Sequence, residues 1–236
     1  MKADSEQQPA YYESRKKRYL RIFDFASKRL KRITAARYDS NFADAVLAKT
    51  RMEFEELLPE TPFIGKSNVF GSIMPINTGI IALYRAMKSQ GRSAEETIQL
   101  CVEFSDQMIR VLPAFVRNIL GHLVFRNPVK RYFAGQAARS QERRFPEDFV
   151  FRLEEGASGE MSLVFDECAV NKFYEAQGAT ELKPYCNFFD VTYSRLLGMG
   201  LDASETIGQG CAKCALRYQS GRATKVPAQL DNMFER

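Results

Sequence analysis

The sequence predicts an α+β fold, in which a helical N-terminal half precedes a C-terminal half with an antiparallel sheet and short helices. Apolar residues between 12 and 33 recur at spacings of three, four and seven, which is the pattern of an amphipathic helix, and helix caps and stops mark further helices as far as residue 112. From about residue 145, short runs rich in Phe and Val alternate with turn residues, as in antiparallel strands. We expect a helical region at 11–145 and an α+β region with four of the five cysteines at 146–220, together forming one compact unit, and a loose tail at 221–236.

The first helix is predicted from an apolar stripe that faces away from a run of lysines and arginines. The stripe consists of Tyr12, Tyr19, Ile22, Phe23, Ala26, Leu30 and Ile33. A helix of this kind docks on the core through its apolar stripe, and we expect that role here. Attachment to a membrane surface is the alternative, because tyrosine side chains suit either environment.

Three more helices are predicted in the N-terminal half, at 40–60, 74–91 and 93–112, with a loop rich in Gly, Pro and Ser at 61–72. Ser40 or Asn41 is expected to cap the first of them, and Gly91 to close the second. Ser93 and Glu96 have the spacing of a capping box at the start of the third. Local capping signals therefore define most of these helix ends.

The C-terminal half is predicted to contain two pairs of strands. Segments 148–156 and 161–170 flank the turn "ASGE" and indicate a β-hairpin, whereas 201–210 and 214–220 indicate two more antiparallel strands around a glycine-containing turn. Between the pairs, a short helix at 170–178 stops at Gly178, and a second helix at 183–200 starts at Pro184.

Composition narrows the class of protein. The chain has 236 residues, of which 45% are apolar and 27% are charged, as is usual for a soluble globular protein. The start "MKADSEQQPA" lacks the apolar core of a secretory signal, and no apolar run approaches the ~18 residues of a transmembrane helix. Five cysteines are an odd number, which favours reduced thiols over a disulfide framework. We therefore expect a cytoplasmic protein without a transmembrane segment.

The formal net charge is +5, and basic residues cluster at 14–21, 27–32 and 138–144. We interpret these clusters as solvated helix faces, with nucleic acid or an anionic membrane surface as the alternative partners. No zinc-finger spacing, RNA-binding aromatic motif or helix-turn-helix pattern supports a nucleic-acid partner, so we expect none. His122 is the only histidine and is predicted to be structural or exposed, which excludes a histidine-rich metal site.

The cysteines allow four hypotheses, which centre on the stretch "IGQGCAKCALRY". Cys211 and Cys214 could be half of a zinc site that Cys168 and Cys186 complete. They could form a redox pair, although that motif sits at a helix N-terminus and 214–220 has the pattern of a strand. Cys168, Cys186 and Cys214 could be pocket thiols beside an uninvolved Cys211, or all four could be packed without chemistry. The fifth cysteine, Cys101, lies in a helix among apolar residues and is predicted to be a core residue.

Two segments resemble the L-2-amino-thiazoline-4-carboxylic acid hydrolase family: "ECAVNKFYEAQGATELKPYCNFFD" and "LDASETIGQGCAKCALRY". The family's pattern in this region is a Cys before a short helix ending in Gly, then Glu-Leu, then a Cys with an Asp four residues on, and finally a Gly and a Cys-Asp-Phe-Arg segment. The matching positions here are Cys168, Gly178, Glu181, Leu182, Cys186, Asp190, Gly210, Cys214 and Arg217.

The N-terminal half carries the same resemblance. "ELLPETPFIGKSN" is similar to the family's Leu-Pro-x-x-Pro-Tyr-Ile-Gly-Gly loop, and "IALYRAMKSQGRSAEE" to its Ala-Leu-Tyr helix. The resemblance runs from about residue 11 to 220, so it covers nearly the whole chain. Three positions depart from the pattern: Lys66 replaces the loop's second Gly, while Ala215 and Leu216 replace the Asp and Phe after the last Cys. Loss of that Asp points to a different substrate or a lost activity.

The resemblance implies a hydrolase that acts on a C–N bond of a small cyclic amidine or amide with a carboxylate substituent. In the reaction for which the family is named, water attacks the carbon between nitrogen and sulfur and converts an aminothiazoline carboxylate to an N-carbamoyl cysteine. We expect a small-molecule substrate, no metal and no cofactor. The alternative from another class is a non-enzymatic module in which the same thiols bind a small ligand or a metal, or sense redox state.

The catalytic assignments that follow are Cys186 as nucleophile, Asp190 as acid/base, and Cys214 and Cys168 as further thiols of the site. Such a reaction needs a nucleophile, a proton donor for the leaving group and a cation for the substrate carboxylate. Arg217 is assigned as that cation. Regular strand alternation places Arg217 on the opposite face from Cys214, so its role requires a bulge near Gly210.

Cys186 and Asp190 also suggest a physical mechanism of activation. If a helix starts at Pro184, Cys186 lies in its first turn, where free N–H groups and the helix dipole favour a thiolate. We therefore expect Cys186 to have a lowered pKa and to react as a thiolate below about pH 8. Asp190 lies one turn later on the same face, and its charge opposes the dipole. The two groups are expected to titrate as a coupled pair.

Overall fold

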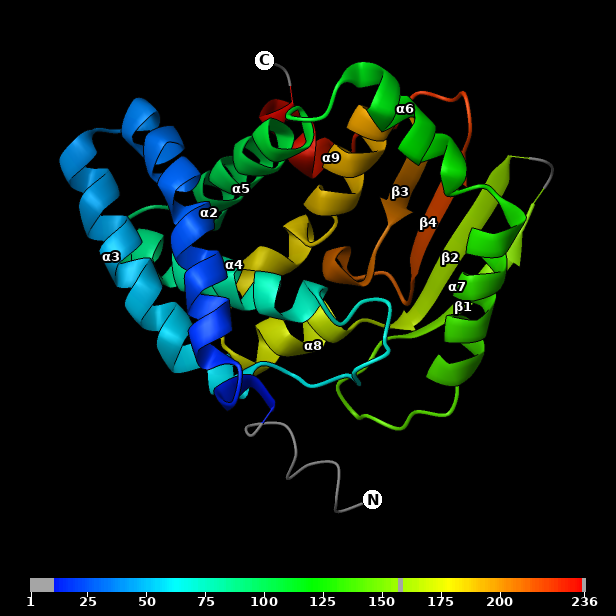
Figure 1. Ribbon diagram of the computed structural model, residues 1–236, viewed down its shortest axis with the longest axis horizontal. Helices are drawn as coiled ribbons and strands as arrows, with labels where there is room; N and C mark the ends of the chain where they lie inside the picture. Colours follow the sequence, from blue (N-terminus) through cyan, green and yellow to red (C-terminus); the bar gives the residue numbers. More distant parts are fainter. Residues whose placement is uncertain (1–10, 157–158, 235–236) are drawn as a thin grey trace. The chain divides into compact units, whose positions relative to one another are not determined.

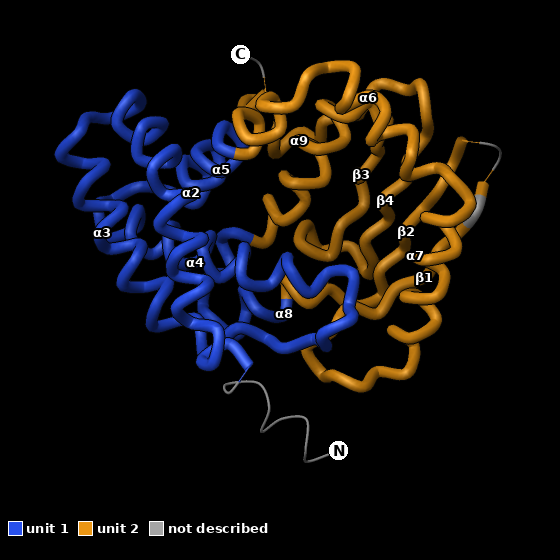
Figure 2. The backbone as a smooth tube through the Cα atoms, in the orientation of Figure 1, with its two compact units in different colours: residues 1–104, 172–182 blue, residues 105–171, 183–236 orange. Residues whose placement is uncertain are grey.

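The computed structural model describes residues 11–156 and 159–234, and it confirms the predicted α+β class (Figure 1). Its contacts group into two compact units (Figure 2). Unit 1 comprises the described residues up to Phe104 together with Lys172–Leu182, and unit 2 comprises Ser105–Asn171 and the described residues from Lys183 onward. The expectation that 11–145 and 146–220 form one compact unit stays a prediction.

Unit 1 is built on helices that the sequence predicts. They are α2 (Lys16–Arg37), α3 (Ser40–Leu57) with the 3-10 turn η1 (Leu58–Glu60), α4 (Ile73–Ser89) and the first part of α5 (Ala94–Ile109). The apolar stripe docks α2 as expected, since Ile33 is buried and Phe23 stacks on Phe54 of α3 with ring centroids 4.9 Å apart, and Tyr12, which precedes α2, is buried as well. Ile22 was wrongly included in the stripe, because 53% of it is exposed.

The helix ends follow from local hydrogen bonds. Ser93 and Glu96 form the predicted capping box. The backbone N–H of Glu96 donates to the Ser93 hydroxyl at 3.1 Å, and the backbone N–H of Ser93 donates to the Glu96 carboxylate at 2.9 Å. Gly91 closes α4 with φ +72°, a conformation that L side chains rarely adopt. The cap of α3 differs from both predicted residues, because Asp39 accepts the N–H of Phe42 at 2.8 Å. Aspartate caps a helix as well as serine or asparagine does, so the sequence left three neighbouring choices.

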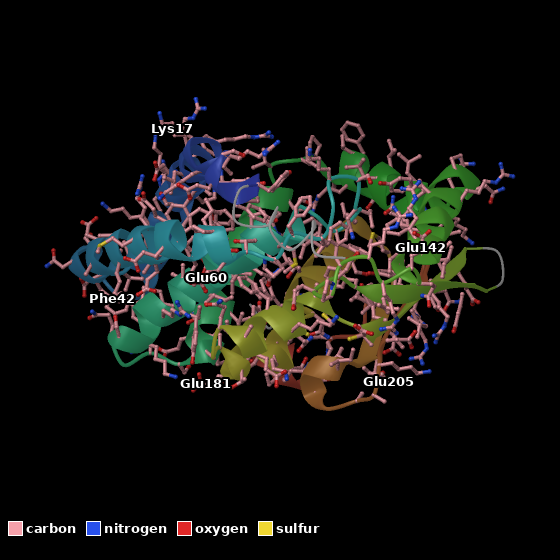
Figure 3. The ribbon with its side chains drawn as sticks, turned by 90° about the horizontal axis from the view of Figure 1, so that it is seen from below. Lys17, Phe42, Glu60, Glu142, Glu181 and Glu205 are labelled. Atoms are coloured by element: carbon pink, nitrogen blue, oxygen red, sulfur yellow. The ribbon has the colours of Figure 1, made fainter. Side chains whose placement is uncertain are left out.

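The segment Lys172–Leu182 is held to α4 by polar contacts. Arg85 donates to the backbone oxygen of Gln177 at 3.0 Å, and Lys88 forms an ion pair with Glu181 at 3.0 Å (Figure 3 labels Glu181). Cys101 lies in the core of unit 1, as predicted, and burial raises its pKa to about 12. It therefore belongs to the packing and is an unreactive thiol at neutral pH.

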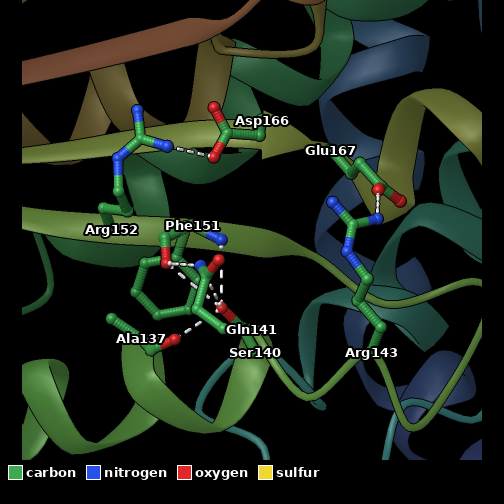
Figure 4. A network of polar contacts seen from close by, with 8 residues as sticks. All are labelled: Ala137, Ser140, Gln141, Arg143, Phe151, Arg152, Asp166 and Glu167. Carbon is green, nitrogen blue, oxygen red and sulfur yellow. Dashed lines mark hydrogen bonds and ion pairs between the residues drawn. The ribbon is translucent and has the colours of Figure 1, made fainter.

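Unit 2 contains a four-stranded antiparallel sheet with strand order β1-β2-β4-β3. The strands are β1 (Val150–Glu155), β2 (Glu160–Glu167), β3 (Leu201–Glu205) and β4 (Cys214–Gln219). The predicted hairpin is therefore confirmed, and so is the second pair of strands. Ser140, at the end of α7 (Asn127–Ser140), accepts the N–H of Phe151 at 3.0 Å and ties that helix to β1 (Figure 4).

Two helices of unit 2 lie in a segment that the sequence analysis left undivided, α6 (Ala114–Leu123) and α7. After β2 come α8 (Ala169–Ala176), the 3-10 turn η2 (Thr180–Tyr185), α9 (Phe188–Leu197) and, after β3, the turn η3 (Ile207–Gln209). The single helix predicted at 183–200 is thus wrong: Pro184 lies inside η2, and α9 begins after Asn187. Proline favours the start of a helix but equally fits a 3-10 turn, so it gave a false helix start.

The described residues after Gly221, up to 234, pack on unit 2, where the sequence predicts a loose tail. The N–H of Lys225 donates to the backbone oxygen of Leu201 at 2.8 Å, and Leu230 in the turn η4 (Ala228–Met233) is fully buried. His122 is exposed, as expected, with its Nδ1 atom 3.3 Å from the hydroxyl of Ser220. Among the described residues, no helix combines the length and the apolar composition needed to cross a membrane.

Candidate active site

Three of the cysteines meet in unit 2, although they come from three separate segments. Cys168 lies between β2 and α8, Cys186 lies between η2 and α9, and Cys214 begins β4. The side-chain amide of Asn171 joins two of them, because its Nδ2 atom donates to the sulfur of Cys168 at 3.3 Å and to that of Cys186 at 3.6 Å. The structure therefore brings together the thiols that the family resemblance singles out.

Cys168 occupies the N-terminus of α8 and has the most hydrogen-bond donors of the three. The backbone N–H groups of Val170 and Asn171 donate to its sulfur in addition to the Asn171 side chain. Burial raises the pKa of the Cys168 thiol, and these donors oppose that rise because they stabilise a thiolate. The dipole of α8 acts in the same direction. The helix-terminal thiol of this site is therefore Cys168.

Cys186 lies outside α9, since Asn187 is the N-cap of that helix. Burial raises its pKa well above the ordinary value, and the neighbouring thiols and Asp190 raise it further. The prediction that Cys186 reacts as a thiolate below about pH 8 is therefore wrong, because desolvation opposes the charged form and the expected helix start is absent. The expected effect of the Asp190 charge is confirmed, because this charge raises the pKa of Cys186.

Gly208 in η3 packs against the segment that carries Cys186. A Cβ atom at this position would lie 2.0 Å from the backbone oxygen of Lys183 and 2.9 Å from the sulfur of Cys186. Only glycine allows so close an approach without a shift of the backbone. The turn η3 thus packs directly against the segment that carries Cys186, which is possible because Gly208 has no side chain.

Cys214 is buried, and the N–H of Ile207 donates to its sulfur at 3.1 Å. Burial and the neighbouring Cys168 raise its pKa to about 12. Alternation along β4 places Tyr218 on the same face as Cys214, and Tyr218 is also buried. Burial, followed by the charge of Asp190, raises the pKa of Tyr218 well above its ordinary value. Both side chains are therefore neutral near pH 7.

Asp190 is the ionisable carboxyl group of this cluster. It lies in the first turn of α9, whose start is tied to β3 by the Asn187 side chain, which donates to the backbone oxygen of Ala203 at 3.3 Å. Burial raises the pKa of Asp190 from 3.8 to about 6, and its own backbone N–H opposes the rise. Its charge contributes to the raised pKa of all three thiols. Asp190 can therefore exchange a proton close to neutral pH.

Arg217 does not join the thiols. Alternation along β4 directs it to the opposite face from Cys214, and it forms an ion pair with Glu205 at 3.1 Å (Figure 3 labels Glu205). The bulge of this sheet edge lies in β3, between Asp202 and Glu205, and leaves the register of β4 with β2 continuous. The bulge that a carboxylate-binding role would need is therefore absent from β4.

Two of the hypotheses assign the cysteines to a metal site or to a redox pair. Across residues 11–156 and 159–234, no three His, Cys, Asp or Glu side chains are grouped so that they could hold a metal ion. Cys211 is exposed beside η3, and Cys214 opens a strand instead of a helix, unlike a thioredoxin-type pair. Cys211 is therefore more exposed to solvent than Cys168, Cys186 and Cys214, and the pocket-thiol hypothesis likewise sets it apart from them.

Asn171 is the residue of this site that sequence analysis missed. Only 4% of it is exposed, and within the described structure its Oδ1 atom has no hydrogen-bond partner. A buried acceptor without a partner is costly and calls for a functional explanation. The available signal was its position three residues after Cys168, which puts it in the first turn of the helix that Cys168 begins.

Comparison with known proteins supports the resemblance. The profile of the L-2-amino-thiazoline-4-carboxylic acid hydrolase family matches residues 74–218, which is more than half of the chain and includes every residue of the cluster described above. No curated protein matches the chain, and no solved structure does. The matched region holds the three clustered thiols, Asn171 and Asp190 in one unit. On this match, the chain belongs to the L-2-amino-thiazoline-4-carboxylic acid hydrolase family.

Proposed function

We propose that this protein hydrolyses a small cyclic amidine with a carboxylate substituent, of the 2-aminothiazoline-4-carboxylate type. The observation that carries the proposal is a carboxyl group with a pKa of about 6 among three clustered thiols, in a chain of a hydrolase family. A general acid/base is most effective when its pKa lies near the working pH. Asp190 meets that condition because of its burial.

The attacked atom is the amidine carbon, which bears two nitrogens and the ring sulfur. An N-carbamoyl cysteine keeps both nitrogens on this carbon, so the bond that opens the ring is the C–S bond, in place of the C–N bond expected from the sequence. The ring sulfur leaves and must receive a proton. The reaction therefore needs one group that first accepts a proton and then donates it, and Asp190 is the group proposed for both steps.

We assign the nucleophile to Cys168 in place of Cys186. Three N–H donors and a helix N-terminus stabilise a thiolate at Cys168, whereas the pKa of Cys186 is raised well above its ordinary value. Asp190 accepts the thiol proton as the Cys168 sulfur bonds to the amidine carbon. The ring C–S bond then breaks, and Asp190 returns the proton to the ring sulfur. The carbon is left attached to the enzyme through the Cys168 sulfur.

Water completes the reaction by attack on the same carbon. Asp190 accepts one water proton and passes it to the departing Cys168 sulfur. The other water proton ends on the imine nitrogen as the carbonyl of the product forms. One water is consumed in total, and both Cys168 and Asp190 return to their starting states.

Asn171 is proposed to orient the amidine. Its Nδ2 atom is engaged by the sulfurs of Cys168 and Cys186, which leaves Oδ1 as an acceptor without a partner in the described structure. The N–H groups of an amidine are donors that can satisfy it. Binding would then remove the cost of a buried, unpaired oxygen, and a substrate that lacks those donors would leave the cost in place.

The test is product formation from 2-aminothiazoline-4-carboxylate, followed by mass spectrometry. Asp190→Asn should lower kcat about 10²–10⁴-fold, which is the usual contribution of an acid/base group. Because the base must be ionised, wild-type kcat/KM should rise with pH through a midpoint near the pKa of about 6 of Asp190. Cys168→Ser should be inactive, with the mass of a substrate adduct seen on wild-type enzyme only.

Two cysteine variants distinguish the roles. Cys211→Ser changes an exposed thiol outside the cluster and should keep wild-type kcat and KM. Cys186→Ser should keep a measurable rate if Cys168 is the nucleophile. If Cys186→Ser is inactive while Cys168→Ser turns over, the nucleophile assignment is wrong. If every variant and the wild type leave the amidine intact, the proposed reaction itself is wrong.

A further inference from the structure

The segment between Asp106 and Glu142 has an unusual charge pattern. It contains no acidic residue, although the chain as a whole is rich in them. Its basic residues are Arg110, Arg117, Arg126, Lys130, Arg131 and Arg139. The segment covers α6 and α7 of unit 2 and is therefore a positively charged part of this unit. It shares no residue with the thiol cluster.

Within this segment, α6 is oriented with its apolar side toward solvent. Gly121 is buried against α9, so closely that a Cβ atom would lie 1.9 Å from the backbone oxygen of Leu197. At 100° per residue, the opposite side of the helix carries large apolar side chains. These residues form what we call the α6 apolar face: Phe115, Ile119 and Leu123 opposite Gly121, Leu120 at the flank of the helix, and Leu112 just before its start. All five are exposed, and Phe115 is 67% exposed.

This orientation is the reverse of the usual one. An amphipathic helix normally turns its apolar side to the core, because exposed apolar surface of this extent is unfavourable in water. The close approach at Gly121 holds α6 in the reversed orientation, since a turn of the helix would drive a side chain into the backbone of α9. The packing at Gly121 thus fixes the exposure of the α6 apolar face, and a binding partner that buried this face would remove the unfavourable exposure.

Unpaired positive charge accompanies this face. Arg126 lies three residues after the end of α6, Arg131 lies in the first half of α7, and Arg139 lies near the end of α7. All three are exposed, and no ion pair between described residues involves any of them. An apolar helix face with free arginines nearby is the combination that binds a bilayer with anionic headgroups.

We propose that the α6 apolar face docks on an anionic lipid surface, with its apolar side chains in the interface and the arginines on the headgroups. Charge complementarity selects this occupant. A second copy of the chain would bring the same positive segment against itself without an acidic residue to offset it. Nucleic acid would contact the arginines but would leave the apolar face uncovered. An anionic bilayer satisfies both features at once.

Vesicle co-sedimentation of the full-length protein tests the proposal. Binding is measured with vesicles of phosphatidylcholine alone and with an equal mixture of phosphatidylcholine and phosphatidylglycerol. We expect binding to the mixed vesicles, with a loss of at least tenfold in Phe115→Ser/Ile119→Ser because each side chain loses its apolar burial. Arg126→Gln/Arg131→Gln should lose roughly fivefold per arginine. The matched control is Phe25→Ser, which removes an equally exposed Phe from α2 and should bind as the wild type does.

Several outcomes would overturn the proposal. Equal binding to vesicles with and without phosphatidylglycerol would remove the electrostatic part of the argument. A loss of binding in Phe25→Ser but not in the α6 variant would move the surface to α2. A dimer seen by light scattering, which dissociates in Phe115→Ser/Ile119→Ser, would identify a second copy as the occupant. Circular dichroism of each variant confirms that a loss of binding is not a loss of fold.

Discussion

Replacing Asp190 by asparagine is expected to stabilise the folded protein while it removes the proposed acid/base. Burial raises the pKa of this carboxyl from 3.8 to about 6, so ionising it costs more in the folded than in the unfolded chain. At pH 7 the group is ionised in both states, and the folded protein bears the full cost. Asparagine has nearly the same shape and carries no charge, so the substitution removes that cost.

The magnitude follows from the pKa shift. Roughly two pKa units correspond to about 3 kcal/mol at pH 7, because one unit is about 1.36 kcal/mol. The value is an upper bound, since the half-buried Asp190 keeps some contact with solvent and an asparagine amide must also be desolvated. Between pH 4 and 6 the folded protein binds more protons at this site than the unfolded chain, so stability falls as pH rises. The gain from Asp190→Asn should therefore be about half as large at pH 5 as at pH 7.

Urea denaturation of wild type and Asp190→Asn at pH 5 and pH 7 measures this difference. The matched control is Asp166→Asn, which removes an acidic residue of unit 2 that forms an ion pair with Arg152 at the surface (Figure 4). Such a pair contributes about 0–1 kcal/mol, so the control should lose little stability. The reasoning is refuted if Asp190→Asn is less stable than wild type at pH 7. It is also refuted if the difference between them fails to grow from pH 5 to pH 7.

Three further substitutions test how the structure positions the site and its supports. Gly208→Ala should lower the free energy of unfolding by about 1–3 kcal/mol and slow turnover, because the new methyl group collides with the backbone at Lys183. In the same urea denaturation experiments, the control Gly135→Ala should be neutral or slightly stabilising, because there is open space around Gly135. Asp39→Ala should cost about 1 kcal/mol in urea denaturation through loss of the α3 cap, and an unchanged midpoint would contradict the assigned cap. Ser140→Ala should cost about 0.5–1.5 kcal/mol by removing the hydrogen bond that the Ser140 hydroxyl accepts from the N–H of Phe151, with hydrogen exchange of that amide as a second readout.

The sequence alone determined those features that depend on residues a few positions apart. The capping box of Ser93 and Glu96, the closure of α4 at Gly91 and the hairpin of β1 and β2 were all predicted and are all present. Each of them is satisfied by hydrogen bonds or turn geometry within a short stretch of chain, so local residue types suffice. The sequence alone also identified the family, because the family is recognised by motifs in the sequence itself.

Only the tertiary structure decided which thiol lies at a helix start among N–H donors, and which way α6 faces. Pro184 indicated a helix start at Cys186, but the donors that favour a thiolate surround Cys168. The raised pKa of Asp190 arises from its burial in the folded chain, and desolvation acts through space and not along the sequence. The pattern of α6 marks an amphipathic helix without saying which side is buried, and the close approach of Gly121 to Leu197 turned its apolar side outward. Spacing along the chain specifies which residues share a face, whereas packing between segments specifies what that face meets.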